Sequence, residues 1–156
     1  MNWKQHLAFG GVVGVALVAS LEAFNVYSPR SFLEAVGVMM LILLSSLAPD
    51  LDHTNSKIHA LAYTVGASLL LLGATQILFH RRFPYSSENL FLFGVVVLGL
   101  TGVFASLHHR GPWHSIAAGA LYGLVVAVLT QPLFGLVAFM GFYTHLACDN
   151  LWFKLV

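Results

Sequence analysis

Charged side chains are scarce in this chain. Lysine, arginine, aspartate and glutamate make up only 8% of its 156 residues, whereas 58% of the residues are hydrophobic. A soluble domain carries roughly 25% charged residues, so the composition excludes an ordinary water-soluble domain. The formal net charge of +1 provides no field that would recruit nucleic acid, and we expect no direct nucleic-acid partner. We expect a single integral-membrane domain over residues 1–156, with the lipid bilayer as its main partner.

Cysteine and proline are also rare. The one cysteine, Cys148, excludes an internal disulfide and argues against a thiolate zinc site. Four of the five prolines stand in the breaks between apolar segments, and Pro49 is the last residue of its segment. Each segment is close to the roughly 17–25 residues that span a bilayer. The segments are residues 6–24, 32–49, 59–79, 89–107, 114–130 and 133–150. The sequence therefore predicts an all-α, polytopic bundle of about six transmembrane helices.

Histidine and aspartate are unevenly distributed over this predicted bundle. Six alternating crossings place the amino terminus, the second and fourth connections and the carboxyl terminus on one side. All three aspartates and seven of the eight histidines fall on that side. They form four clusters, at His6, residues 49–53, residues 108–115 and residues 145–149. A count of five helices would separate some clusters across the bilayer, so the sorting favours six helices and one site at one membrane face.

The spacing within two clusters is typical of metal ligands. His145 and Asp149 are four residues apart at a helix end, so their side chains point the same way. Asp50 and Asp52 are close enough to repel each other unless a cation or a proton compensates them, and His53 follows directly. A hydrogen-bonded His–Asp pair or a plain interfacial turn would give the same patterns without a metal.

The fourth connection combines imidazoles with groups that bind anions. Gly111-Pro112 makes a tight turn that can bring His109 and His114 towards each other. Arg110 suits a phosphate or carboxylate, or a lipid headgroup. Ser115 stands at a helix start, where it can cap the helix and where free N–H groups can bind an anion.

These clusters together predict a metal site built from histidine and aspartate. Such mixed sets favour Zn, with Mn or Fe as alternatives. The number of candidates suits two ions, or one ion with outer groups that orient its ligands. Asp52 is the candidate general base, and Arg110 with Ser115 would hold an oxyanion. The candidate ligands are His6, Asp50, Asp52, His53, His109, His114, His145 and Asp149.

A small-residue pattern concerns helix packing. Gly119 and Gly123 form a G-x-x-x-G, which lets helices approach closely in lipid. We interpret it as packing within the bundle, although the same spacing would suit a homo-oligomer.

The motifs resemble a known family over about 145 residues. The chain is similar to the YdjM-type membrane-bound, metal-dependent hydrolases, described as LexA-binding and inner-membrane-associated. One departure is Trp113, where members often have threonine. The resemblance implies a metal-dependent hydrolase, and zinc-dependent phospholipase C offers a more distant analogy. The matching elements are His6 with Leu7-Ala8-Phe9-Gly10, Pro49-Asp50-Leu51-Asp52-His53 with Asn55-Ser56-Lys57, His109-Arg110-Gly111 with His114-Ser115, and His145-Leu146 with Asp149.

The leading hypothesis is a hydrolase in the cell (inner) membrane that acts on an ester or phosphodiester, including lipid-like substrates, at the interface. A metal or proton transporter is the alternative. However, residues 63–79 and 90–107 contain no charged residue that could pass a metal ion or a proton across the bilayer. A non-catalytic metal-binding protein and a haem-binding bundle are further hypotheses. The site side has four lysines and arginines and the other side has three, a difference too small for the positive-inside rule to set the orientation. Our hypothesis is a cytoplasmic site.

Overall fold

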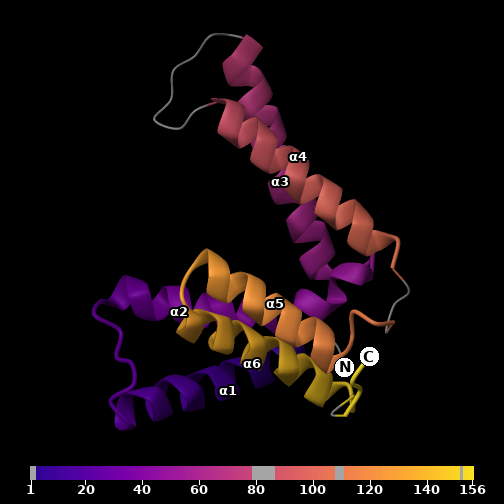
Figure 1. Cartoon of the computed structure of the whole chain (residues 1–156). Coiled ribbons are helices and arrows are strands. Elements are labelled where there is room, and N and C mark those ends of the chain that lie inside the picture. Colours follow the sequence, from indigo (N-terminus) through magenta and orange to yellow (C-terminus); the bar gives the residue numbers. More distant parts are fainter. Residues whose placement is uncertain (1–2, 79–86, 108–110, 152) are drawn as a thin grey trace. The chain divides into compact units, whose positions relative to one another are not determined.

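The computed structural model describes residues 3–78, 87–107, 111–151 and 153–156, which are helical with short connections and contain no strand. Each predicted apolar segment overlaps one α-helix of the described residues, which confirms the all-α class. The helices are α1 (Trp3–Ala23), α2 (Phe32–Ser45), α3 (Lys57–Leu78), α4 (Ser87–Ala105), α5 (Ile116–Leu129) and α6 (Pro132–Cys148), with the 3-10 helix η1 (Ala48–Asp52) after α2 (Figure 1).

The helices differ in whether they are long enough to cross a bilayer. Among the described residues, Trp3–Ala23 and Lys57–Ile77 are apolar over sufficient length, and the other four apolar helices are shorter. A helix rises about 1.5 Å per residue, so the 14-residue α2 extends roughly 21 Å, against about 30 Å for the hydrocarbon core. This helix ends at Ser45, and the chain turns into η1 around Pro49, whose ring and missing N–H do not suit a helix interior.

The chain forms two compact units. The first comprises Met1–Pro49 and His109–Val156 and contains α1, α2, α5 and α6, whereas the second comprises Asp50–His108 and contains α3 and α4. That both units make one membrane domain stays a prediction.

Close packing of α5 on α6 organises the first unit. A Cβ on Gly119 would lie 2.8 Å from the ring of Phe142, and a Cβ on Gly123 would lie 2.8 Å from the carbonyl oxygen of Gly135. The G-x-x-x-G of α5 therefore packs within the chain, in agreement with our interpretation.

The apolar core of the first unit lies where α2 and α6 meet. Val38, Ile42 and Val137 form one buried cluster. Ala48, at the start of η1, forms another with Phe142 and Leu146 near the end of α6. The helices α2 and α6 run parallel to each other. The residues that follow α2 therefore lie against the last turn of α6.

The second unit is a helical hairpin in which the backbones of the two helices approach each other closely. A Cβ on Gly73 would overlap the backbone of Phe91, and a Cβ on Gly94 would overlap the backbone of Leu70. Figure 1 shows α3 and α4 side by side along their lengths. Two glycines facing the opposite backbone therefore set the closeness of this pair.

Candidate metal centre

His145, in the last turn of α6, is the central residue of the candidate site. Its side chain is fully buried, and its Nδ1 lies 2.9 Å from the carbonyl oxygen of Ser46. A carbonyl oxygen can only accept, so Nδ1 carries the proton and donates this hydrogen bond. In the neutral ring Nε2 then has the lone pair that a metal requires. The structure thus presents His145 in the tautomer of a metal ligand.

Asp149 stands at the end of α6 and faces two imidazoles. Its Oδ2 lies 3.7 Å from His145 Nε2, and its Oδ1 lies 3.6 Å from His6 Nε2. The backbone of Asn150 is left-handed, with φ of 59°. The N–H groups of Asn150 and Leu151 donate back to carbonyls of α6, which is how a helix ends in a Schellman motif. This ending fixes Asp149 as the C-cap, one turn beyond His145.

His6 reaches the same place from the first helix. Its ring stacks on that of His145, with centroids 3.9 Å apart and an angle of 8° between the planes. The His6 side chain is buried. The first and last helices therefore bring two histidines and one carboxylate into direct contact.

His114 completes the group from the connection before α5. Its fully buried ring meets His145 edge-on, with centroids 5.4 Å apart and planes at 66°. The neighbouring Trp113 donates from Nε1 to the carbonyl of Ala48 at 3.1 Å, and its ring packs against Phe142. These contacts hold the connection against the start of η1 and against α6, so His114 faces the core of the first unit.

The donor atoms of this cluster suit a divalent metal. One ligand atom each from His114, His145 and Asp149 lie within 4.8 Å of one another. Tetrahedral zinc ligands at about 2.0–2.1 Å from the ion would be roughly 3.3 Å apart, so small side-chain movements would close the set. Two imidazoles and one carboxylate also match the donors found in catalytic zinc sites, which keep a fourth position open. These residues therefore fit the predicted metal.

The aspartate cluster of the second connection belongs mainly to the second unit. Asp50 and Asp52 lie in η1, and Asp52 is buried. The Nδ1 of His53 accepts a hydrogen bond from the Asn55 N–H at 3.1 Å, which places the ring proton on Nε2 in the neutral ring. The convergence of these residues with the histidines of the first unit stays a prediction.

The anion-binding role predicted for the start of α5 is wrong in one respect. Ser115 caps the helix, because its Oγ accepts from the Ala118 N–H and donates to the Pro112 carbonyl. The N–H groups of Ile116 and Ala117 are taken by carbonyls of the C-terminal tail, at 2.8 and 3.2 Å. The expected free N–H groups are therefore used within the chain. His109 and Arg110 lie outside the described residues.

The carbonyls of the C-terminal tail that cap α5 belong to Lys154 and Leu155. Lys154 Nζ also donates to the Gly111 carbonyl at 2.7 Å. The sequence reasoning missed this role of the tail, and it missed the Ser46 carbonyl. Ser45 and Ser46 are both fully buried at the end of α2, but two serines at the end of an apolar helix do not indicate which group a backbone carbonyl there will bind.

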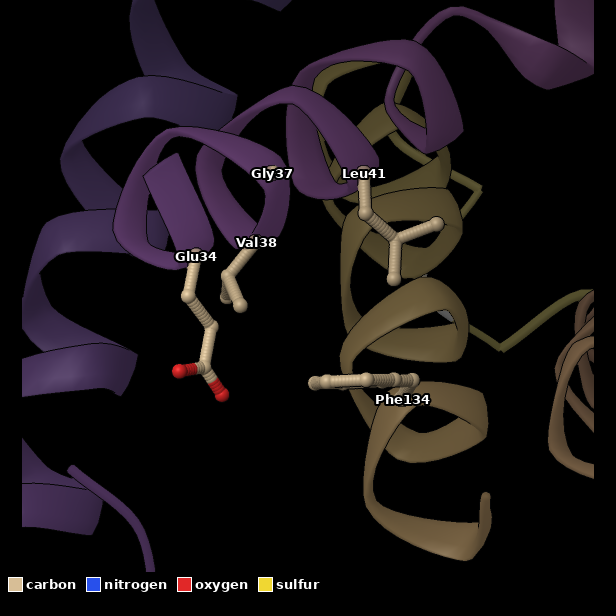
Figure 2. Close-up of a pocket in the computed structure, with 5 residues that line it drawn as sticks. All are labelled: Glu34, Gly37, Val38, Leu41 and Phe134. Carbon is tan, nitrogen blue, oxygen red and sulfur yellow. The ribbon is translucent and has the colours of Figure 1, made fainter. Parts of the chain in front are cut away.

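A separate cavity of about 220 Å³ lies between α2 and the start of α6 (Figure 2). It is at the ends of these helices that lie away from His145. Its single acidic group, Glu34, accepts hydrogen bonds from the Tyr27 hydroxyl and the Arg30 N–H, each at 2.8 Å. The remaining walls are hydrocarbon, so this cavity lacks the ligand set found around His145. The lining residues are Glu34, Gly37, Val38, Leu41 and Phe134.

Comparison with known families matches the chain over residues 1–154 to the family described as YdjM inner membrane protein. No curated protein and no solved structure matches the chain. The matched region runs from before His6 to beyond Asp149 and so contains the whole cluster. It confirms the resemblance noted from the motifs, and it supports a membrane location together with the two long apolar helices. The chain belongs to the YdjM inner membrane protein family.

Proposed function

We propose that this protein is a membrane-embedded, metal-dependent hydrolase whose ion is held by His114, His145 and Asp149. The observation that carries the proposal is the compact N, N, O donor set within the apolar first unit. Zinc is the ion we favour, with Mn or Fe as alternatives. When bound, such an ion lowers the pKa of a coordinated water to about 7 and so supplies hydroxide at neutral pH.

The residues of the chain orient and shield this centre. The Ser46 carbonyl holds the His145 ring so that Nε2 faces Asp149. His6 covers one face of the His145 ring and lies beside the second oxygen of Asp149. Groups that fix a ligand in this way are worth about 10–100-fold in metal affinity or activity. His6 therefore contributes as a ligand or as an orienting neighbour.

The substrate class that we propose is an ester or phosphodiester, lipid-like ones included. In a bundle with six crossings, a centre at the ends of the apolar helices would lie where lipid headgroups meet water, which supports this class. Asp52 remains our candidate general base and Arg110 our candidate for holding an oxyanion. We assign Ser115 no chemical role, because its hydroxyl proton is already donated to the Pro112 carbonyl.

Hydrolysis is tested by substitution at two of these positions. Asp52→Asn and His114→Ala should abolish turnover of esters or phosphodiesters by zinc- or manganese-loaded protein, since one loses the base and the other a metal ligand. The helical circular dichroism signal should hardly change, because bundle packing and lipid burial stabilise the helices. Glu34→Gln, at the opposite end of α2, is the control and should retain wild-type rates.

Either variant turning over a confirmed substrate at the wild-type rate would show that the site is assigned wrongly. Purified protein that binds metal tightly, with no exchangeable water on the ion and no turnover of any substrate class, would replace the hydrolase with a non-catalytic metal-binding protein. Zinc flux into proteoliposomes would replace it with a transporter.

We also propose six membrane crossings with the metal centre on the cytoplasmic side. Support comes from the first unit, where the cluster gathers the start of α1, the end of α2, the start of α5 and the end of α6. This is the alternation that six crossings require. The short helices would match the bilayer by local thinning or by their flanking residues.

Membrane topology is tested by labelling the two ends of the chain. Single cysteines at positions 2 and 155, in a Cys148→Ser background, should react with an impermeant maleimide from the same side of the membrane. We expect that side to be the cytoplasm, so intact spheroplasts should protect both cysteines and inverted vesicles should expose both. Labels on opposite sides would exclude an even number of crossings.

A further inference from the structure

The buried residues of the first helix lie on one of its faces. Within α1 the buried residues are His6, Gly10 and Gly14, spaced by four and so on one face. A Cβ on Gly14 would lie 3.1 Å from the Ile42 side chain. The position of His6 therefore depends on how closely the two glycines let α1 approach α2.

Gly10 makes the tightest of these contacts, and its partner belongs to the site. A Cβ at this position would lie 2.8 Å from Ser46 Oγ and 2.9 Å from Ser46 Cβ, whereas the next atom, Thr144 Oγ1, is 3.8 Å away. Ser46 is the residue whose carbonyl accepts the hydrogen bond from His145. Ser46 thus orients His145 through its carbonyl and also forms the surface of α2 against which α1 packs at Gly10.

We propose that Gly10 is a positioning residue of the metal centre. Its missing side chain lets α1 lie close enough to Ser46 for the His6 ring to stack on His145 and for His6 Nε2 to lie beside Asp149. Any larger residue displaces α1 away from Ser46 and removes His6 from the site. The part of this inference that concerns metal affinity rests on the proposed function, whereas the seating of His6 does not.

The chain offers a compensating variant and a matched control. Gly10→Ala should separate α1 from α2, and adding Ser46→Gly should restore the contact, because it removes both clashing atoms and keeps the carbonyl that holds His145. Gly11→Ala is the control, since a Cβ there would meet only Leu43 Cδ2, at 3.8 Å. Gly11→Ala changes helix propensity by the same amount as Gly10→Ala, at the neighbouring position.

The position of the His6 side chain can be measured without metal, through its accessibility to diethyl pyrocarbonate. The rate of His6 modification is followed by mass spectrometry in detergent-purified, metal-free protein. His6 should be protected in the wild type and in Gly11→Ala, lose its protection in Gly10→Ala, and regain it in Gly10→Ala/Ser46→Gly. Zinc affinity, from competition with a chromophoric chelator, should fall by about 10–100-fold in Gly10→Ala and recover in the double variant.

Equal protection of His6 in wild type and Gly10→Ala would overturn the proposal, as would a double variant that stays unprotected. If Gly10→Ala cannot be purified, recovery of folded, protected protein on adding Ser46→Gly supports the proposal, and failure of the double variant overturns it. If His6 protection follows the expected order but the wild type binds no zinc, the positioning role of Gly10 stands and the proposed metal function fails.

Discussion

Asp149→Asn and His145→Ala are each expected to abolish zinc binding by the purified protein. The asparagine keeps the shape of the side chain and the backbone hydrogen bond that ends α6, but it removes the charge and one donor oxygen. The alanine removes the imidazole that lies against His6, His114 and Asp149. Groups that only orient a ligand are worth about 10–100-fold in affinity, so loss of a ligand should exceed about 100-fold.

Metal content by mass spectrometry and a zinc competition titration would measure this loss. Glu34→Gln is the matched control for Asp149→Asn, because it makes the same carboxylate-to-amide change in the same unit, at the opposite end of α2. It should leave zinc affinity unchanged. Wild-type affinity in both Asp149→Asn and His145→Ala would refute the assigned metal centre.

Gly94→Val is expected to separate the hairpin formed by α3 and α4. The added side chain would overlap the backbone of Leu70, which cannot move aside without shifting the whole helix. Overpacking of this kind costs typically about 1–3 kcal/mol and occasionally more, and overlap with backbone places this variant at the upper end. We expect a corresponding loss in the free energy of unfolding, and no other glycine of α4 should be as sensitive.

Gly99→Val, in the same helix, isolates the packing effect. A Cβ at Gly99 meets nothing within 4 Å, whereas the change in helix propensity is the same as at Gly94. An SDS titration would measure unfolding in a Cys148→Ser background, with a fluorophore pair on cysteines placed at Ala60 and Val103 near one end of the hairpin. Equal stability of the two valine variants would mean that α3 and α4 do not pack through Gly94.

The sequence was sufficient to predict the helices and the residues that gather in the first unit. Six apolar segments correspond to the six helices, and helix counting placed His6 at the same end as His145 and Asp149. The spacing of four residues predicted the proximity of His145 to Asp149, because side chains one turn apart lie on the same face. These predictions worked because they depend on helical periodicity, which local sequence determines.

Other parts of the site depend on contacts between distant segments and could not be predicted. Nothing in the local sequence indicates that the Ser46 carbonyl would accept a hydrogen bond from His145. The tail carbonyls of Lys154 and Leu155 occupy N–H groups at the start of α5 that the sequence suggested would be free. The helix start itself is correctly predicted at Ser115, because N-capping is local.

The pairing of His6 with His145 has a consequence for biosynthesis. The helix α1 leaves the ribosome while α6 is still unmade, so His6 meets its partners only after α6 has been synthesised. A nascent chain, or one truncated before α6, holds an isolated histidine in α1 and cannot retain an ion there. In the proposed metal centre, an ion could therefore be bound only after α6 has been made, and bound metal would mark chains in which α1 and α6 have come together.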